Sequence, residues 1–160
     1  MKIESLSTPI LRYLEQYNVD YQLLPHRTPA ISIEDAAQQR GINTEQMVKC
    51  LLLRDMSDRL ALACVPGNRH VDPKKVRAHL NWRRMTCVAR EQVEVLTGYT
   101  VGTVTPLCLK QSMPILFDPT ILQQTTVTIS SGSPLAGIAL WRDDLLHLCR
   151  PIMANIVREP

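Results

Sequence analysis

The segments MVKCLLL at residues 47–53 and LALACV at residues 60–65 decide the fold, because both are apolar runs of strand length. The polar residues DMSDR at 55–59 separate them. Apolar runs of about four to eight residues bounded by turn signals are typical of strands that are buried on both faces. The two segments therefore predict a hairpin of buried strands at the centre of a sheet.

Helical and extended segments alternate irregularly around this hairpin. Ser32 with Asp35 three positions later approximates the capping box of a helix that ends at Gly41. The predicted helices cover residues 9–17, 32–40, 73–80, 90–96 and 142–149, and further predicted strands cover residues 19–24, 85–88, 113–117, 126–130, 138–141 and 152–157. Residues 100–106 predict a strand interrupted by a loop. Because the order has no strict βαβ rhythm, we expect an α/β fold with a mixed central sheet flanked by helices.

The composition predicts one folded domain with a mild positive charge. With 160 residues, 45% of them hydrophobic, the chain can bury a core, and we expect residues 1–160 to form a single domain. Thirteen arginines against five lysines, at a net charge of +3, suit bidentate contacts to phosphate or carboxylate and permit a nucleic-acid partner. Only seven aromatic residues argue against a surface that recognises bases by stacking.

The five cysteines stand at least fourteen positions apart, and their number is odd. They are Cys50, Cys64, Cys87, Cys108 and Cys149. This spacing predicts neither disulfides nor a zinc site, and we expect no metal and no cofactor. Residues 1–10 lack the apolar region of a signal peptide, and no apolar run approaches the roughly 18 residues of a membrane span. We therefore expect a reduced, cytoplasmic protein that has no membrane partner.

Lys49 is the most distinctive single residue, because it lies within the apolar segment 47–53. Desolvation lowers the pKa of an ammonium group and a bound anion raises it, so Lys49 fits the role of a base, an amine anchor or a phosphate anchor. The alternative is that strand alternation turns its side chain to solvent.

Two loops offer groups that bind a substrate without a reactive side chain. In GTVTP at residues 102–106, glycine allows close approach of the backbone and proline fixes the exit, which leaves N–H groups free to hold a carbonyl or ester oxygen. The segment SSGS at residues 130–133 offers hydroxyls and a flexible backbone. Ordinary turns are the alternative interpretation of both loops.

Several familiar catalytic motifs are missing from the sequence. It has no GxSxG, HExxH, Walker or GxGxxG motif, which removes the usual serine hydrolase, metalloprotease and nucleotide-binding interpretations. Cys50 beside Lys49 is a candidate nucleophile, although its apolar setting favours an inert core thiol.

The histidines are scattered along the sequence, and we expect each at the surface or at a helix cap rather than at a metal. They are His26, His70, His79 and His147. A basic group suits phosphate contacts or a solvated helix face. Its members are Lys74, Lys75, Arg77, Arg83 and Arg84.

The order of the motifs is more specific than any one of them. A loop with His26 and the dipeptide TP at 28–29 precedes the helix that ends at Gly41. There follow MVKCLLL at 47–53, VPG at 65–67, VDPKKV at 71–76, TGYTVGTVTP at 97–106, PILFD at 114–118 and SSG at 130–132. In this order the motifs resemble the YbaK/prolyl-tRNA synthetase-associated domain family, from about residue 8 to residue 157.

The resemblance implies a mixed-sheet α/β domain and an aminoacyl-tRNA deacylase that acts in trans. Its expected substrate is tRNA-Pro carrying a small wrong amino acid such as Ala, Cys or Ser, and its expected partners are aminoacyl-tRNA and an aminoacyl-tRNA synthetase. Such an activity fits the physics of selection, because a pocket separates amino acids that differ by a methylene only about 10 to 200-fold. A second, hydrolytic selection step then removes the errors.

The resemblance also implies roles for particular residues. Lys49 corresponds to the family's essential lysine and would anchor the terminal phosphate or the carbonyl of the substrate and stabilise negative charge while water attacks the ester. The loop that holds the aminoacyl ester corresponds to Gly102, Thr103, Val104, Thr105 and Pro106. The expected substrate-binding residues are His26, Thr28, Pro29 and Ile31 in one segment and Ser130, Ser131 and Gly132 in another.

The chain departs from the family pattern after Gly132. Relatives often carry a His four positions after this glycine or an Asp five positions after it, and this chain has Ala136 and Gly137 there. Small residues at these places predict a roomier or less polar pocket and leave the amino-acid preference open. The alternative function is a non-catalytic module of the same fold that binds tRNA, a synthetase or a small ligand.

Overall fold

The computed structural model describes residues 8–160. Its helices are α1 (Pro9–Gln16), α2 (Ile33–Arg40), α3 (Pro73–Leu80), α4 (Arg90–Thr97) and α5 (Arg142–Cys149), with short 3₁₀ segments η2 (Thr44–Gln46) and η3 (Pro119–Gln123). Its strands are β1 (Tyr21–Pro25), β2 (Val48–Asp55), β3 (Leu60–Pro66), β4 (Met85–Cys87), β5 (Ile115–Phe117), β6 (Thr126–Ser130), β7 (Ala136–Trp141) and β8 (Ile152–Met153). The predicted α/β class with mixed strand directions is confirmed.

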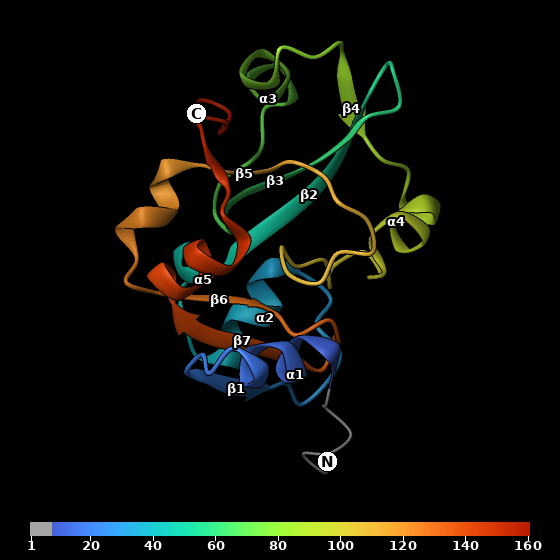
Figure 1. The fold of residues 1–160 in the computed structure, drawn as a ribbon. Coiled ribbons are helices and arrows are strands. Elements are labelled where there is room, and N and C mark those ends of the chain that lie inside the picture. The colour runs from blue at the N-terminus through green and yellow to red at the C-terminus, as the bar shows by residue number, and fades with distance from the viewer. Residues whose placement is uncertain (1–7) are drawn as a thin grey trace.

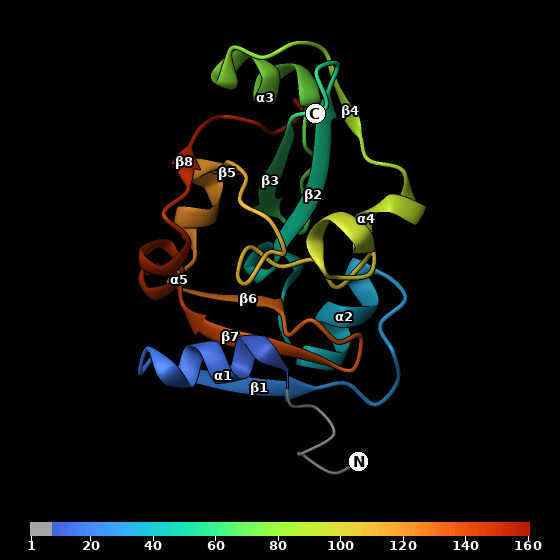
Figure 2. The same ribbon diagram turned by 45° about the vertical axis from the view of Figure 1, so that its right-hand side comes forward.

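The strands form two sheets where the sequence predicted one. A three-stranded antiparallel sheet has the order β1-β7-β6, and a five-stranded mixed sheet has the order β4-β2-β3-β5-β8. The three-stranded sheet lies with α1 at the end of the molecule near the N-terminus, and α3 lies at the opposite end (Figures 1 and 2). A single parallel bridge between Met47 and Thr128 joins the two sheets. This junction brings the start of β2 close to β6.

The predicted hairpin of β2 and β3 is confirmed and lies in the middle of the larger sheet. Alternate side chains of β2 enter two separate cores. Val48 and Leu52 pack in a cluster with Ile10 of α1, whereas Leu53 packs in a second cluster with Val76 of α3. Because both faces are covered, the strand carries a continuous apolar run rather than an alternating pattern.

The helix α2 begins and ends where the sequence predicted, but its cap is simpler than a full capping box. The Oγ of Ser32 accepts a hydrogen bond from the amide of Asp35 at 3.0 Å. The carboxylate of Asp35 accepts from the amide of Ile31 at 3.0 Å, one residue earlier than the reciprocal bond of a capping box. Gly41 ends the helix in the left-handed conformation, with φ of 73°.

The chain between α4 and β5 is the clearest difference from prediction. Residues 100–106 form no strand, because a turn closed by the amide of Thr103 and the carbonyl of Thr100 interrupts the extended backbone. The segment η3 was not predicted, and the last strand is short. Its expected continuation instead donates the amides of Ile156 and Val157 to the buried carboxylate of Asp118, at 2.9 and 3.2 Å.

Asp55 fixes the turn between β2 and β3. Its carboxylate accepts hydrogen bonds from the amides of Ser57 and Arg59 at 2.9 Å and from the guanidinium of Arg59 at 2.6 and 2.9 Å. Burial acts to raise the pKa of Asp55, but these hydrogen bonds and one from the Arg83 amide outweigh it and lower the pKa from 3.8 to about 2.

This lowered pKa makes part of the stability depend on pH. Since the folded state holds the proton less tightly than the unfolded state, the contribution of Asp55 is complete above its unfolded pKa of 3.8 and declines as the pH falls toward about 2. We expect Asp55→Asn to lower the free energy of unfolding at pH 7 and to flatten its decline between pH 4 and about pH 2. Urea unfolding across this range measures both effects. The exposed Asp58→Asn in the same turn is the control, and equal pH dependence in both variants would contradict the assignment.

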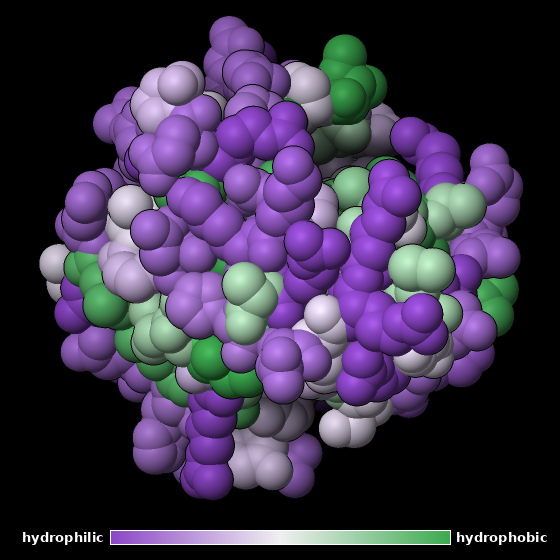
Figure 3. All heavy atoms as spheres, turned by 90° about the horizontal axis from the view of Figure 1, so that it is seen from above, coloured by the Kyte–Doolittle hydropathy of each residue, from purple (hydrophilic) through white to green (hydrophobic). Residues whose placement is uncertain are grey.

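Seen from the end that carries α3, the surface is predominantly hydrophilic, with a few smaller hydrophobic areas (Figure 3). A pocket of about 220 Å³ on this part of the chain is lined by several members of the basic group, Lys74, Arg77 and Arg84, together with Arg158. Lys75 is engaged elsewhere, with its Nζ 2.7 Å from the carbonyl of Val157. No helix within residues 8–160 is both long and apolar enough to cross a membrane.

Candidate active-site cleft

A cleft of about 550 Å³ lies where α2, the loop after α4 and the turn between β6 and β7 meet. This volume is within the usual range for small-molecule sites. Four of the predicted site residues line it, namely His26, Ile31, Gly102 and Ser130. They come from segments that are up to about a hundred residues apart, so the fold brings together what the sequence shows only as separate motifs.

Lys49 is half-buried and is not itself among the residues that line this cleft, but its hydrogen-bond partner Gly67 packs behind two of them. Its Nζ is 3.5 Å from the carbonyl oxygen of Gly67, a long hydrogen bond that is the only one Nζ makes within residues 8–160. Burial lowers the pKa of Lys49, and the negative charge of Glu34 partly offsets this effect. The alternative in which strand alternation turns Lys49 fully to solvent is not met, because the side chain is half-buried, and its functional role stays a prediction.

Gly67 connects Lys49 to the wall of the cleft. Its amide donates to the carbonyls of Thr44 at 3.1 Å and Met47 at 3.0 Å. A Cβ on Gly67 would lie 2.6 Å from the Thr44 oxygen, 3.1 Å from Ile33 Cγ2 and 3.2 Å from Met47 Cβ. Ile33 and Met47 both line the cleft, so the partner of Lys49 is packed directly behind the lining. The sequence contained Gly67 in the VPG motif but gave no reason to place it at the site.

The loop after α4 presents its backbone to the cleft at Gly102. The turn from Thr100 to Thr103 requires a positive φ at Gly102, which is 89°. Nothing lies within 4 Å of a Cβ built on Gly102, because its open side faces the cleft. The amides of Gly102, Val104 and Thr105 donate no hydrogen bond to any residue in the described range 8–160. The predicted loop with free N–H groups is therefore present.

The remaining residues of this loop anchor it rather than line the cleft. Thr103 is buried, and its Oγ1 donates to the carbonyl of Thr100 at 2.9 Å. Thr105 is fully buried, and its Oγ1 has no partner within residues 8–160. Val104 packs against the core cluster that contains Ile10 of α1, and Pro106 is buried. Of the five loop residues predicted for the site, Gly102 alone is in the cleft lining.

Tyr99 holds this loop against the turn between β6 and β7. Its hydroxyl donates to the carbonyl of Leu107, which closes the loop on itself. A Cβ on Gly132 would lie only 3.2 Å from Cε1 of the Tyr99 ring, so the ring packs closely on this glycine. Gly132 also has a positive φ of 92°. This contact explains why the segment around Gly102 and the segment around Ser130 share one cleft.

The segment SSGS forms the hairpin turn between β6 and β7, as the structural alternative predicted. The Oγ of Ser130 accepts from the amide of Gly132 at 3.1 Å, and the Oγ of the buried Ser131 donates to the carbonyl of Ala136 at 2.8 Å. Ser130 and Ser133 nevertheless line the cleft, whereas Ser131 and Gly132 support the turn. Ser130 therefore both stabilises the turn and lines the cleft.

His26 is buried and not at the surface, where the sequence placed it. Its Nδ1 is 2.8 Å from the carbonyl of Pro134, and its Nε2 is 3.1 Å from Nε of Arg40. A carbonyl only accepts and a guanidinium only donates, so this network assigns the proton to Nδ1 and leaves the ring neutral. Burial lowers the pKa of His26, which favours the same neutral form. Both ring nitrogens are occupied within the protein.

Arg40 fills the space where the sequence predicted a roomier or less polar pocket. A Cβ on Gly137 would overlap Nε and Cζ of Arg40 and would lie 2.8 Å from its Cδ. The missing side chain at position 137 is thus replaced by a guanidinium group from α2, which lines the cleft. Ala136 is fully buried and pairs with Pro25 of β1. The prediction of a less polar pocket is wrong at position 137, because the charged guanidinium of Arg40 occupies the volume that a side chain there would fill.

Three other predicted residues lie at the margins of the site. Thr28 and Pro29 are exposed and do not line the cleft. The amide of Thr28 donates to Oε1 of Gln39 at 3.2 Å, which ties this loop to α2. Ile31 lines the cleft and is 89% exposed, an unusual exposure for an apolar side chain. It therefore stands at the cleft mouth.

Cys50 points away from Lys49. Alternate residues of β2 face opposite sides of the sheet. Cys50 packs against the core cluster that contains Ile10 and Val48, and its Sγ is 3.4 Å from Sγ of Cys64. All five cysteines are free thiols. Within residues 8–160, no three His, Cys, Asp or Glu side chains gather closely enough to hold a metal ion.

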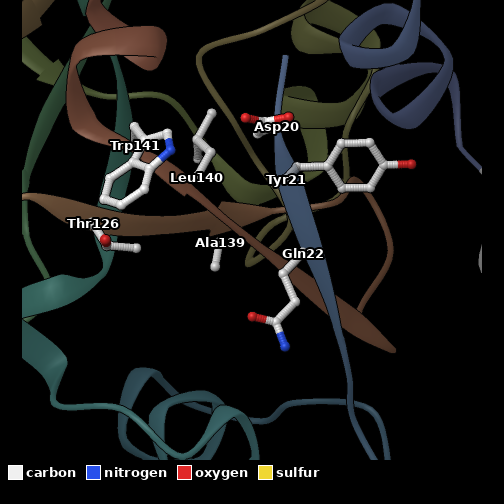
Figure 4. A pocket seen from close by; sticks show the side chains of 7 residues that line it. All are labelled: Asp20, Tyr21, Gln22, Thr126, Ala139, Leu140 and Trp141. Atoms are coloured by element: carbon white, nitrogen blue, oxygen red, sulfur yellow. The ribbon is translucent and has the colours of Figure 1, made fainter. Parts of the chain in front are cut away.

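A smaller pocket of about 280 Å³ lies on the three-stranded sheet and is shown in Figure 4. Gln22 and Ala139 pair across β1 and β7, and Thr126 and Trp141 pair across β6 and β7. Trp141 is 52% exposed beside them. None of the predicted site residues lines this pocket, and it shares no lining residue with the cleft.

Comparison with known protein families identifies the family to which this chain belongs. Residues 28–148 match the model of the family described as "Aminoacyl-tRNA editing domain". The chain belongs to this family. The matched range of this editing domain includes Lys49, the loop at Gly102 and the turn at Ser130, and every lining residue of the cleft except His26 falls within it.

Two relatives illustrate the contexts in which the editing domain occurs. A protein of Enterococcus faecalis named "Putative Cys-tRNA(Pro)/Cys-tRNA(Cys) deacylase EbsC" is 24% identical over 154 residues, which are 95% of this chain and 94% of that protein. A proline–tRNA ligase of Kosmotoga olearia is 25% identical over 120 residues, which are 72% of this chain and 20% of the ligase. The same domain is thus similar to a nearly equal-sized protein and to a part of a larger enzyme.

Solved structures confirm the fold of the editing domain. A crystal structure of the hypothetical protein APE2540 superimposes with a TM-score of 0.86 at 19% identity and covers 93% of this chain and 99% of the other. A crystal structure described as "a putative trans-editing enzyme for prolyl tRNA synthetase" has a TM-score of 0.84 at 22% identity and covers 96% of this chain and 99% of that one. Both share the arrangement of the two sheets at low sequence identity.

Proposed function

We propose that this editing domain is a deacylase that acts in trans and hydrolyses the ester between tRNA-Pro and a small wrong amino acid such as Ala, Cys or Ser. The observation that carries the proposal is that Lys49, through Gly67, adjoins a cleft lined by Gly102, whose amide donates no hydrogen bond within residues 8–160. The names of the relatives, a tRNA deacylase and a proline–tRNA ligase, support the same substrate class.

In this proposal, water is the nucleophile and the protein stabilises the charge that develops. Water attacks the ester carbonyl carbon, the carbonyl oxygen becomes negative, and the bond to the terminal ribose oxygen then breaks. One proton from the water ends on the ribose hydroxyl, and the free amino acid is released. The Gly102 amide and the Lys49 ammonium are the donors for the negative oxygen, a role in which prearranged donors are worth several kcal/mol.

The setting of Lys49 suits this electrostatic role. The one hydrogen bond that its ammonium makes in the described part of the chain, to Gly67 at 3.5 Å, is long, so two further N–H donors are available for a substrate. Burial lowers its pKa, and a negative oxygen beside it would act in the opposite direction. The interaction therefore strengthens as charge develops in the transition state, which is the requirement for catalysis.

Cys50 takes no part in this chemistry, because its thiol lies on the face of β2 opposite to Lys49. We expect Cys50→Ala to retain the deacylation rate within about 3-fold, and alkylation by iodoacetamide to have equally little effect. Single-turnover release of alanine from alanyl-tRNA-Pro measures both. A loss of activity in the variant that remains folded would revive the thiol as the nucleophile.

We further propose that residues 1–160 act as one domain in the cytoplasm, with tRNA and a synthetase as partners. The basic residues Lys74, Arg77, Arg84 and Arg158 around the pocket beside α3 provide contacts for tRNA phosphates. Such contacts position a nucleic acid but carry no sequence information. A synthetase partner would then supply the selectivity for tRNA-Pro.

The test is release of amino acid from alanyl-, cysteinyl- and seryl-tRNA-Pro, with prolyl-tRNA-Pro as the matched control. We expect at least one mischarged substrate to be hydrolysed at least 10-fold faster than prolyl-tRNA-Pro and faster than the spontaneous rate. If all four substrates decay at the spontaneous rate, the chain is instead a binding module of the same fold. Retained binding of tRNA in that case would identify such a module.

A further inference from the structure

The guanidinium of Arg40 lines the cleft and has no carboxylate partner among residues 8–160. Its Nε donates to Nε2 of the neutral His26 at 3.1 Å, and its Nη1 donates to Oγ1 of Thr128 at 3.0 Å. Neither acceptor carries a charge, and none of the ion pairs found within residues 8–160 includes Arg40. Burial lowers its pKa to about 10, which still leaves it charged at neutral pH. A half-buried cation whose partners are all neutral is costly, so this arrangement suits an anion from outside the protein.

The other groups of the cleft point to the same chemistry. An arginine offers five N–H donors, and hydrogen bonds within residues 8–160 use two of those on Arg40. A second arginine, Arg90 at the start of α4, also lines the cleft. No Asp or Glu is among the lining residues. The cleft lining therefore presents positive charge and unused donors, and the nearby acidic residues Glu34 and Asp35 of α2, whose charges act on Lys49 and His26, lie outside that lining.

Gly137 makes the position of Arg40 possible. The guanidinium lies over the backbone of β7, in the volume that a Cβ at position 137 would take. The backbone of Gly137 does not adopt a positive φ, so alanine fits there without conformational strain. The overlapping atoms belong to the end of a flexible side chain, which can move aside. A single methyl group at position 137 therefore displaces the guanidinium and keeps its charge.

We propose that Arg40 binds an anionic oxygen group of the ligand that occupies this cleft. The existence of this anion site follows from the geometry of the cleft alone. The identity of the anion rests on the function proposed above, and we assign it to the phosphate on the 5′ oxygen of the terminal adenosine of tRNA. The α-carboxyl of an aminoacyl ester has no negative charge, so this phosphate is the anion that every aminoacyl-tRNA offers near the ester. Guanidinium groups bind phosphate through two parallel N–H donors.

The binding test uses adenosine 5′-monophosphate and adenosine as probes, so it needs no catalytic activity. We expect the wild-type protein to bind the monophosphate at least 10-fold more tightly than adenosine in calorimetric titrations. Arg40→Met and Gly137→Ala should each reduce this preference to about 2-fold or less. The double variant should lose no more than either single variant, since both changes remove the same contact. Arg12→Met, on the exposed side of α1, is the control for net charge and should keep the preference.

The kinetic test distinguishes this inference from the proposed function. If the protein is a deacylase, Arg40→Met should raise KM for alanyl-tRNA-Pro about 10-fold and leave kcat within about 3-fold, because phosphate binding is equal in the ground and transition states. A preference for the monophosphate that survives in folded Arg40→Met overturns the inference, whatever the activity. If no substrate is hydrolysed but the preference depends on Arg40, the anion site stands and the deacylase proposal fails. An effect confined to tRNA charged with Asp or Glu overturns the phosphate assignment in favour of a side-chain carboxylate.

Discussion

Lys49→Ala is expected to lower the single-turnover rate of deacylation by at least about 100-fold, the usual effect of removing one donor from an oxyanion site. The reason is that Nζ, whose one hydrogen bond within residues 8–160 is a long contact of 3.5 Å to the carbonyl of Gly67, adjoins the cleft through that glycine. Alanine leaves the apolar wall of Ile33 and Met47 intact, so substrate binding should change less than the rate. Release of labelled alanine from alanyl-tRNA-Pro measures the effect, and the exposed Lys110→Ala is the control.

Removal of the Lys49 charge should not destabilise the protein, and Lys49→Met is the variant that tests this. Burial lowers the pKa of Lys49, which means that the folded state disfavours its charged form relative to water. Replacing it with methionine, which keeps the length of the side chain, should leave the free energy of unfolding unchanged or raise it. Activity lost at unchanged or increased stability is the pattern of a residue kept for function. A large loss of stability with normal activity of the folded fraction would contradict this role.

Gly67→Ala is expected to have the second largest effect, because it disturbs both stability and the site. The new Cβ would lie 2.6 Å from the backbone oxygen of Thr44, and backbone atoms yield less easily than side chains. Overpacking of this kind costs about 1–3 kcal/mol. The shift would also move the carbonyl that holds Lys49, so we expect deacylation to fall at least about 10-fold in the folded protein.

Urea unfolding and single-turnover kinetics separate the two effects of Gly67→Ala. Val76→Ala is the matched control, since it removes buried methyl groups from the second core cluster beneath α3 and touches no residue of the cleft. We expect both variants to lose stability but Gly67→Ala alone to lose activity. An equal rate in the two folded variants would show that the carbonyl of Gly67 does not position Lys49.

Most of the fold could be predicted because local signals and burial agree. The apolar runs at 47–53 and 60–65 identify the central hairpin, and Gly41 ends α2 in the expected left-handed conformation. The division into two sheets could not be predicted, because it depends on the bridge between Met47 and Thr128, which are distant in sequence. The loop at residues 100–106 resembles a strand in composition, and a tertiary contact of Tyr99 with Gly132 decides its path.

The candidate site could be predicted at its motifs but not at its supporting contacts. Lys49, Gly102 and Ser130 were found from unusual residues or from turn chemistry. Arg40 and Gly67 were missed, because a helical arginine and a glycine after a strand look ordinary in sequence. Their importance arises from atoms that approach across the fold, the guanidinium over Gly137 and the Gly67 carbonyl beside Lys49. Sequence spacing contains no information about either approach.

The central claim is that the cleft beside Lys49 holds the aminoacyl end of tRNA. The most direct measurement is a titration of ¹⁵N-labelled protein with 3′-alanylamino-3′-deoxyadenosine, a stable amide analogue of that end. We predict the largest amide shifts at Gly102 and Ser130, and little change at Ala139 and Trp141 in the pocket of Figure 4. Shifts concentrated at Ala139 and Trp141, with Gly102 unaffected, would contradict the account.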